Sequence, residues 1–385
     1  MGRHSKKRRV MRHNPAFKKS LVWGILIAAA VPGVLSTAVL YDHVRQSWDG
    51  LAADTAVLSA MYTVPDRAFE QLRERFAQPS DPQQPEQEQE KAQQPLIPPQ
   101  RQEEQPPPTK TQPPPEPVEI PEEYRGTVVE EDLAAAGSSL CFGSGRIKNA
   151  TSLSEQQVEE YLAQPQPFLL DRQGPQVLIM HTHATESYED CDAAQYDTRN
   201  TWRSTDNNRN MVAVGNAIEE ELRKAGIGVV HDTQQFDYPS YNGSYDRAAA
   251  VVRDYLTQYP EIQLVLDIHR DGIQRDATTI VKPATEIDGK PAAQIMILCG
   301  SAPSVGDWGE NLRTAAAVQN LLESRYPTLT RPLYFSTGRY NMDLSGGTIL
   351  LEIGSQANTL EEALHAARLA GQALGDWLHT LAGSA

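Results

Sequence analysis

From about residue 125 onward, short apolar runs alternate with longer amphipathic stretches. The apolar runs that we expect as buried strands occupy residues 177–180, 227–230, 262–268, 293–298 and 348–351. Between them, apolar positions recur at helical spacing, and this predicts helices over residues 207–225, 246–258, 310–325 and 359–377. Such alternation predicts an α/β fold, in which a mostly parallel sheet carries helices on both faces.

Several of these apolar runs end in side chains that bind metals or transfer protons. The residues in question are His181, His183, Glu186, His269 and Glu352. Open α/β sheets place their ligands at the carboxyl ends of the strands, so we expect these side chains to share one site. A single histidine at a strand end is more often a hydrogen-bonded structural residue. The same position at the ends of different strands instead favours a catalytic zinc site built from imidazoles and carboxylates.

Roles within this predicted site follow from spacing. His181 and His183 are two residues apart and would point the same way on a strand, so both could bind one metal, or one could orient the substrate. Glu186 lies in the loop that follows and is a candidate third ligand or general base. His269, on a different strand, would close the metal site.

Glu352 directly follows an apolar run and is the best candidate for a general base that activates water. The alternative is a structural salt bridge to Arg270 or Arg339. Arg270 itself is a candidate for polarising a carbonyl or binding a substrate carboxylate. His231 also follows a short apolar run, and we interpret it as structural or substrate-facing rather than metal-binding.

The first part of the chain predicts a membrane anchor and a spacer. Residues 1–20 are basic, and residues 21–41 form an uncharged apolar stretch long enough for a transmembrane helix. A cleaved signal peptide is the alternative. Residues 42–77 predict a membrane-proximal helical segment, residues 78–124 a Pro/Gln-rich linker, and residues 125–385 the catalytic domain. The expected location is the cell membrane, with one span, a cytoplasmic N-terminus and an extracytoplasmic catalytic domain.

Charge and cysteine content narrow the possible functions. The net charge is −15, although residues 1–20 contain no acidic residue, so the body of the protein is strongly acidic. This excludes nucleic acid as a partner of the body, because phosphate binding needs a basic surface. The 3 cysteines lie far apart without CxxC spacing, so we interpret them as structural.

Taken together, the motifs resemble those of the stage II sporulation protein P family, which comprises membrane-anchored cell-wall hydrolases of spore-forming bacteria. The resemblance lies in four segments, in the order expected for the family: His181–Tyr188, Tyr238–Tyr245, Asp267–Asp271 and Leu351–Gly354.

This resemblance implies a zinc-dependent N-acetylmuramoyl-L-alanine amidase that acts on peptidoglycan, with a second activity on the cross-linked stem peptides. It marks His181, Glu186 and His269 as the critical positions and matches Glu352 to the catalytic glutamate. The start of the helix over 207–225 has no glutamate, which leaves the third zinc ligand between Glu186 and His183. The family also implies a role in spore engulfment alongside stage II sporulation proteins D and M.

Two other classes of function compete with the amidase. A glycan-cleaving enzyme would need paired carboxylates and would leave the histidines unexplained. A non-catalytic peptidoglycan-binding or scaffold protein of the sporulation machinery would tolerate loss of the histidines and bind no stoichiometric zinc.

Overall fold

A computed structural model describes residues 119–138, 140–165 and 174–383. The predicted basic tail, transmembrane helix and membrane-proximal segment, and most of the predicted linker, lie outside the described residues. Among the described helices, none is both long and apolar enough to cross a bilayer.

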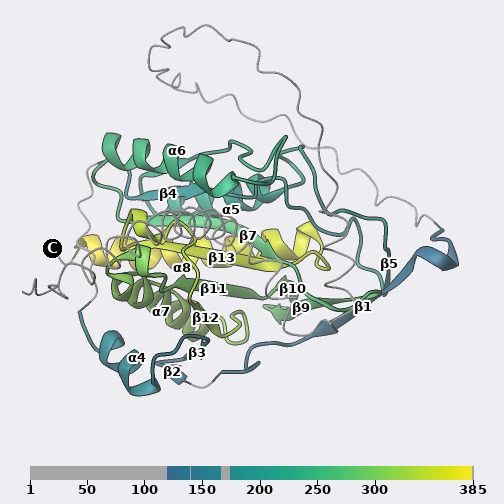
Figure 1. Cartoon of the computed structure of the whole chain (residues 1–385), viewed down its shortest axis with the longest axis horizontal. Coiled ribbons are helices and arrows are strands. Elements are labelled where there is room, and N and C mark those ends of the chain that lie inside the picture. The colour runs from purple at the N-terminus through teal and green to yellow at the C-terminus, as the bar shows by residue number, and fades with distance from the viewer. Residues whose placement is uncertain (1–118, 139, 166–173, 384–385) are drawn as a thin grey trace, which may run out of the picture. The chain divides into compact units, whose positions relative to one another are not determined.

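An eight-stranded sheet forms the centre of the described region (Figure 1). Its strands, in spatial order, are β2 (Leu140–Phe142), β3 (Gly145–Asn149), β12 (Leu333–Ser336), β11 (Ile295–Gly300), β13 (Thr348–Ser355), β7 (Leu264–Asp271), β4 (Val177–Met180) and β6 (Val229–His231). The half that runs from β13 through β7 and β4 to β6 is parallel. In contrast, β11 is antiparallel to β13, and β2 is antiparallel to β3.

The prediction of a mostly parallel sheet is therefore corrected to a mixed sheet. The reason lies in the connection that follows β7. Parallel neighbours need a crossover, usually a helix, whereas antiparallel strands can be joined by hairpins. Here the chain leaves β7 through the strands β8 (Gln274–Asp276), β9 (Thr279–Ile287) and β10 (Lys290–Ala293), and it enters β11 in the opposite direction.

These three strands belong to a second, five-stranded sheet that the apolar pattern did not predict. Its order is β10-β9-β1-β5, with β8 paired to β9, where β1 is Arg125–Glu131 and β5 is Gln195–Asp197. The β9–β10 hairpin turns at Asp288 and Gly289, whose φ angles are 53° and 73°. An Asp-Gly pair with two positive φ angles is typical of the tight turns that join hairpin strands.

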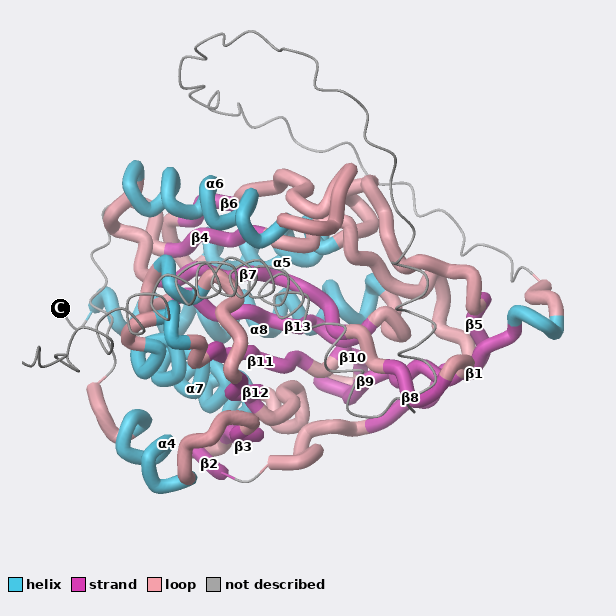
Figure 2. Tube along the Cα trace, viewed as in Figure 1, coloured by secondary structure: helices cyan, strands magenta, loops and turns pink. Residues whose placement is uncertain are grey.

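Helices cover both faces of the eight-stranded sheet, as the alternating pattern predicted (Figure 2). The helices are α4 (Glu155–Leu162), α5 (Met211–Lys224), α6 (Ser244–Gln258), α7 (Trp308–Arg325) and α8 (Leu360–Gly383), with 3₁₀ turns at Glu122–Tyr124, Pro303–Val305 and Met342–Leu344. In β4, Val177 and Ile179 pack into the core under α5, α7 and α8, whereas Leu178 and Met180 pack under α6.

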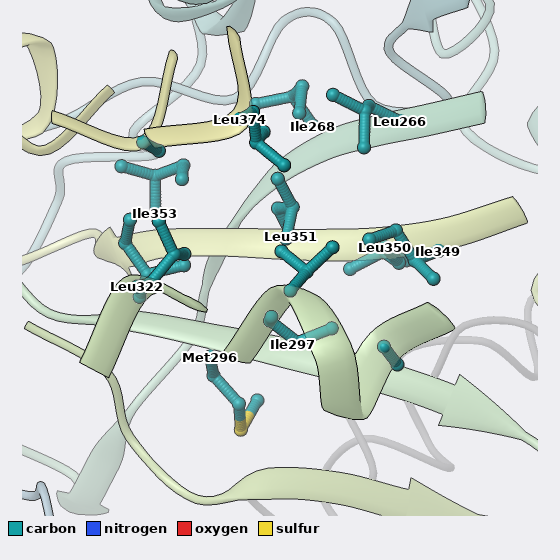
Figure 3. Close-up of a cluster of buried hydrophobic side chains, with 14 of the residues drawn as sticks. Leu266, Ile268, Met296, Ile297, Leu322, Ile349, Leu350, Leu351, Ile353 and Leu374 are labelled. Carbon is teal, nitrogen blue, oxygen red and sulfur yellow. The ribbon is translucent and has the colours of Figure 1, made fainter. Parts of the chain in front are cut away.

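The main core lies between β7, β13, β11 and the helices α7 and α8. Figure 3 shows its side chains, among them Leu266, Ile268, Met296, Ile297, Leu322, Ile349, Leu350, Leu351, Ile353 and Leu374. Helix starts are fixed by capping. Asn210 accepts a hydrogen bond from the Val212 amide at the start of α5, and Thr359 and Glu362 form a capping box before α8.

Candidate functional site

Polar side chains gather at the carboxyl ends of β4, β7 and β13. His183 and Glu186 lie in the segment after β4, while His269 and Glu352 are paired neighbours on β7 and β13. All of them are buried. Because burial of so many ionisable groups is unfavourable without partners, the contacts of each define what the cluster can do.

His269 lies between two carboxylates. Its Nδ1 is 3.5 Å from Glu186 Oε2, and its Nε2 is 2.8 Å from Asp267 Oδ1. The second contact is not a well-directed hydrogen bond, so Nε2 lacks a hydrogen-bond partner. Burial alone would lower the pKa of His269, but Asp267 and Glu186 outweigh it and raise that pKa well above the ordinary value. The two carboxylates thus favour a positive charge at this position.

His183 is enclosed by aromatic rings. It stacks on Tyr241 with a centroid distance of 4.4 Å and meets Tyr245 and His269 edge-on at 5.5 Å and 5.2 Å. Burial lowers the pKa of His183 to about 3. The ring is therefore neutral near pH 7, which is the form that binds metals.

Glu186 is held as a carboxylate although it is buried. Burial would raise its pKa, but the positive charges of Arg270, His269 and Arg203 together lower that pKa. Arg203 Nη2 lies 3.5 Å away and Arg270 Nη1 4.0 Å away, while the Arg270 amide approaches Oε2 at 3.4 Å. Glu186 is therefore an anion at neutral pH.

Glu352 lacks the salt bridge that was the alternative to a catalytic role. Arg339 pairs with Asp343 instead, and the Arg270 side chain points to Glu186 and to backbone carbonyls. Within the described chain, Glu352 Oε2 is a buried atom without a hydrogen-bond partner. Burial, reinforced by the nearby carboxylates of Asp271 and Glu186, raises the pKa of Glu352 to about 8.

The expectation that His181 and His183 both lie on a strand and point the same way for that reason is wrong. Strand β4 ends at Met180, and His183 lies in the turn that follows. The His181 ring faces α5, where its Nε2 lies 2.8 Å from Nε2 of His231. Its Nδ1 lies 3.1 Å from the Ile268 carbonyl oxygen, and burial together with His231 lowers its pKa to about 3.

Sequence reasoning missed the partners of His181. His231 Nδ1 lies 2.9 Å from Glu219 Oε2, which links α5 to the end of β6. Gly215 makes room for both rings, because a Cβ at this position would lie 2.7 Å from Nε2 of His181 and of His231. The interpretation of His231 as structural agrees with this position. The sequence feature that could have indicated the pairing of the two histidines is Gly215, because it lies on the helix face against which they pack.

The guanidinium of Arg270 forms hydrogen bonds with backbone carbonyl groups of the chain and is not turned toward a substrate. Its guanidinium donates to the carbonyl oxygens of Ser187, Trp202 and Asp271, at 3.0, 3.2 and 3.2 Å. It therefore fixes the segment that carries Glu186 and supplies positive charge beside that carboxylate. This placement favours a positioning role over the predicted contact with substrate.

We expect Arg270→Lys to lower the free energy of unfolding by about 2–4 kcal/mol, because lysine cannot replace a planar guanidinium that serves several carbonyls. The matched control is Arg275→Lys, at an exposed arginine on β8, which should change stability by less than about 0.5 kcal/mol. Urea denaturation measures both. Equal midpoints for the two variants would contradict the positioning role.

The side chains of the cluster are of the kinds that bind zinc, although they are not arranged around a common metal position. In the part of the chain that the structure describes, no group of three or more His, Cys, Asp or Glu side chains has metal-binding geometry. However, His183 is a neutral imidazole, Glu186 is a carboxylate, and His269 has a buried Nε2 without a hydrogen-bond partner. Imidazole nitrogen and carboxylate oxygen are the ligands of catalytic zinc sites.

These features define an α/β domain with a buried cluster of histidines and carboxylates at the carboxyl ends of its central strands. The chain belongs to the stage II sporulation protein P (SpoIIP) family, whose model matches residues 57–375. The resemblance seen in the sequence motifs is thereby confirmed.

A curated relative, stage II sporulation protein P of Bacillus subtilis (strain 168), is 29% identical over 243 residues. The match covers 60% of this chain and 58% of that protein, so the chain spans less than two thirds of the length of this relative.

Among solved structures, the chain is similar to the N-acetylmuramyl-L-alanine amidase Ami1 of Mycobacterium abscessus, with a TM-score of 0.33 and 14% identity. That match covers 55% of this chain and 100% of the other. The CwlD amidase of Clostridioides difficile, solved in complex with the GerS lipoprotein, gives a TM-score of 0.31 and 12% identity over 54% of this chain and 96% of the other. At these TM-scores, function has to be argued from the residues of this chain.

Proposed function

We propose that this protein is a zinc-dependent peptidoglycan hydrolase that cleaves the amide bond between N-acetylmuramic acid and the first L-alanine of the stem peptide. We further propose that residues 21–41 anchor it in the cell membrane with the N-terminus in the cytoplasm, and that it acts in spore engulfment with stage II sporulation proteins D and M. Membership of the SpoIIP family supports this setting. Cleavage of stem-peptide cross-links is part of the same proposal.

The observation that carries the proposal is the buried carboxyl of Glu352 beside His269. Hydrolysis of an amide needs a base that takes a proton from water and later returns it to the leaving amine. A carboxyl with a pKa of about 8 is suited to both steps near neutral pH. Its Oε2 lacks a partner among the described residues, so a water molecule and a substrate could bond to it.

In the proposed reaction, Glu352 accepts a proton from water as the water oxygen adds to the amide carbon. The carbonyl oxygen becomes an oxyanion, the C–N bond then breaks, and Glu352 gives its proton to the departing nitrogen of L-alanine. His183, Glu186 and His269 would hold the zinc ion. When bound, zinc supplies a Lewis acid that polarises the carbonyl and lowers the pKa of water. Arg270 keeps Glu186 in place and ionised.

The test is to incubate the full chain with cross-linked peptidoglycan, with and without a chelator, and to identify the released fragments by mass spectrometry. We expect free stem peptides that begin with L-alanine, lost on chelation and restored by added zinc. Fragments cut within the glycan would identify a different hydrolase. If nothing is released and the protein contains no zinc, the non-catalytic peptidoglycan-binding class is correct instead.

A further inference from the structure

Arg203 borders the candidate site but takes no part in the reaction described above. Its Nη1 donates to Asp237 Oδ2 at 2.8 Å, and its Nη2 lies 3.5 Å from Glu186 Oε1. The guanidinium also lies over the ring of Tyr241, at 5.0 Å from the centroid, and that ring stacks on His183 at 4.4 Å. Arg203 therefore contacts one proposed zinc ligand directly and lies one aromatic ring away from another.

The backbone of Arg203 is held in place as well. Arg203 forms an isolated antiparallel bridge with Glu186, and the next amide, of Ser204, donates to the Thr185 carbonyl oxygen at 2.7 Å. A side chain that is held at both its backbone and its guanidinium loses little conformational entropy when a ligand binds. Arg203 is thus preorganised for contact with a ligand.

Among the charged side chains around Glu186, that of Arg203 is the one exposed to solvent. Three cationic side chains contact Glu186, and those of Arg270 and His269 are only 8% and 4% exposed, whereas that of Arg203 is 32% exposed. The carboxylates of Glu186 and Asp237, with which Arg203 pairs, are buried. A molecule that approaches from solvent therefore meets the arginine and not the two carboxylates.

The guanidinium has N–H groups left for a ligand. It carries five of them in one plane, and its hydrogen bonds to described residues reach three acceptors, which are Asp237 Oδ2, Thr185 Oγ1 and Glu186 Oε1. A planar guanidinium binds a carboxylate through two parallel N–H···O bonds. An anionic group of the substrate is therefore the partner that fits this side chain.

The position of Arg203 fits a carboxylate on the peptide that the proposed reaction releases. Arg203 Nη2 and His269 Nδ1 each lie 3.5 Å from the carboxylate of Glu186, so only that carboxylate separates them. An extended chain advances by about 3.3–3.6 Å per residue, so a group one or two residues beyond the cleaved bond spans this gap. In the stem peptide, L-alanine is followed by D-glutamate, which is joined through its side-chain carboxyl and has a free α-carboxylate.

We propose that Arg203 is a specificity-determining residue that binds this α-carboxylate and so selects stem peptides in which it is not amidated. The inference rests on the proposed amidase function and names the part of the substrate that the site recognises. Arg203 takes no part in making or breaking bonds. Its contact is present in the bound substrate and in the transition state alike, so loss of the contact should raise KM more than it lowers kcat.

The experiment uses two soluble muramyl peptides that differ only in this group, a free α-carboxylate or a carboxamide, and it measures kcat/KM for the full-length protein. We expect the wild type to prefer the carboxylate by about 10–100-fold, because a charge-assisted pair is replaced by a neutral contact. Arg203→Gln should cleave the two substrates with nearly equal kcat/KM. The matched control is Arg209→Gln, at an exposed arginine that pairs with Asp190, which should keep the wild-type preference.

A calorimetric titration measures the same preference without turnover. Its ligands are the dipeptide L-alanyl-γ-D-glutamate and the corresponding α-carboxamide. We expect the wild type to bind the carboxylate form about 10–100-fold more tightly, and Arg203→Gln to bind both forms equally. Equal affinities in the wild type would contradict recognition of the carboxylate.

Each result of these measurements supports or overturns the inference. Equal kcat/KM for the two substrates in the wild type would overturn it and leave the amidase function intact. If Arg203→Gln slowed both reactions by the same factor and kept the preference, Arg203 would act only by holding Glu186 and Asp237, which also overturns the inference.

A second variant covers the case in which Arg203→Gln does not fold. Arg203→Lys keeps the charge beside Glu186 and Asp237 but lacks the planar guanidinium, so the preference should fall several-fold. An undiminished preference in this variant would overturn the inference. A wild type that cleaves neither the muramyl peptides nor intact peptidoglycan would overturn the proposed function, and this inference with it.

Discussion

Replacing Glu352 with glutamine is expected to lower kcat for peptidoglycan by about 10²–10⁴-fold, because it removes the only group of the cluster suited to shuttle the proton. Glutamine has nearly the same shape as the protonated carboxyl, so the fold should survive. Fragment release followed over time measures the effect. The matched control is Glu361→Gln, at an exposed glutamate in the first turn of α8, which should leave kcat unchanged.

The same substitution should also change how stability depends on pH in zinc-free protein. The unfolded chain ionises Glu352 near pH 4.5, whereas the folded protein does so near pH 8. Between these values the unfolded state binds fewer protons than the folded state. The free energy of unfolding of the wild type therefore falls as pH rises, and it levels off above about pH 8. Glu352→Gln should match the wild type near pH 4 and exceed it at pH 8. Parallel stability curves for the two proteins would contradict a raised pKa at Glu352.

Substitution of His269 with alanine has the second largest expected effect. It leaves Asp267 and Glu186 as buried carboxylates without the positive charge between them, and breaking a buried ion pair in this way costs about 3–5 kcal/mol. It also removes a proposed zinc ligand, so zinc content and activity should be lost. Chemical denaturation and metal analysis measure these changes. His379→Ala, on the exposed face of α8, is the control.

A double variant separates the electrostatic cause from simple loss of packing. If unpaired charge is responsible, adding Asp267→Asn to His269→Ala should recover part of the lost stability, because one of the two carboxylates is then neutral. If the cavity left by the imidazole is responsible, the second substitution should lower stability further, since it also weakens the hydrogen bonds from Thr182. Activity should not return in either case.

The sequence predicted those parts of the fold that depend on local periodicity. The helices α5, α6, α7 and α8 and the parallel strands β4, β7 and β13 follow from apolar spacing, whereas α4 was not predicted, and Thr359 correctly indicated the start of α8. The second sheet could not be predicted in this way. Strand β8 is wholly exposed, and β1 pairs with β5 and β9, which lie far away in the chain, so its pairing depends on tertiary contacts that no short pattern reports.

The direction of β11 was hidden for a related reason. The apolar pattern of a strand is the same whether the strand is parallel or antiparallel to its neighbours. Only the preceding hairpin at Asp288 and Gly289 indicates that the chain has reversed its direction. In the site, the sequence placed Glu186, His269 and Glu352 together because all three are close to strand ends. It did not indicate that strand β4 ends at Met180, so the expectation that His181 and His183 share the spacing of a strand was wrong.

The antiparallel insertion of β11 has a consequence for how the site works. Glu352 pairs with His269 on one side and with Met296 on the other, so its backbone is bonded into the middle of the sheet on both flanks. His183, by contrast, lies in the turn after β4, and Glu186 follows it in an isolated bridge to Arg203 outside the sheet. If Glu352 is the proton acceptor proposed above, it is a fixed reference point, and we expect adjustment to the proposed polymeric substrate to occur in the turn after β4 and at the ring of Tyr241 that stacks on His183.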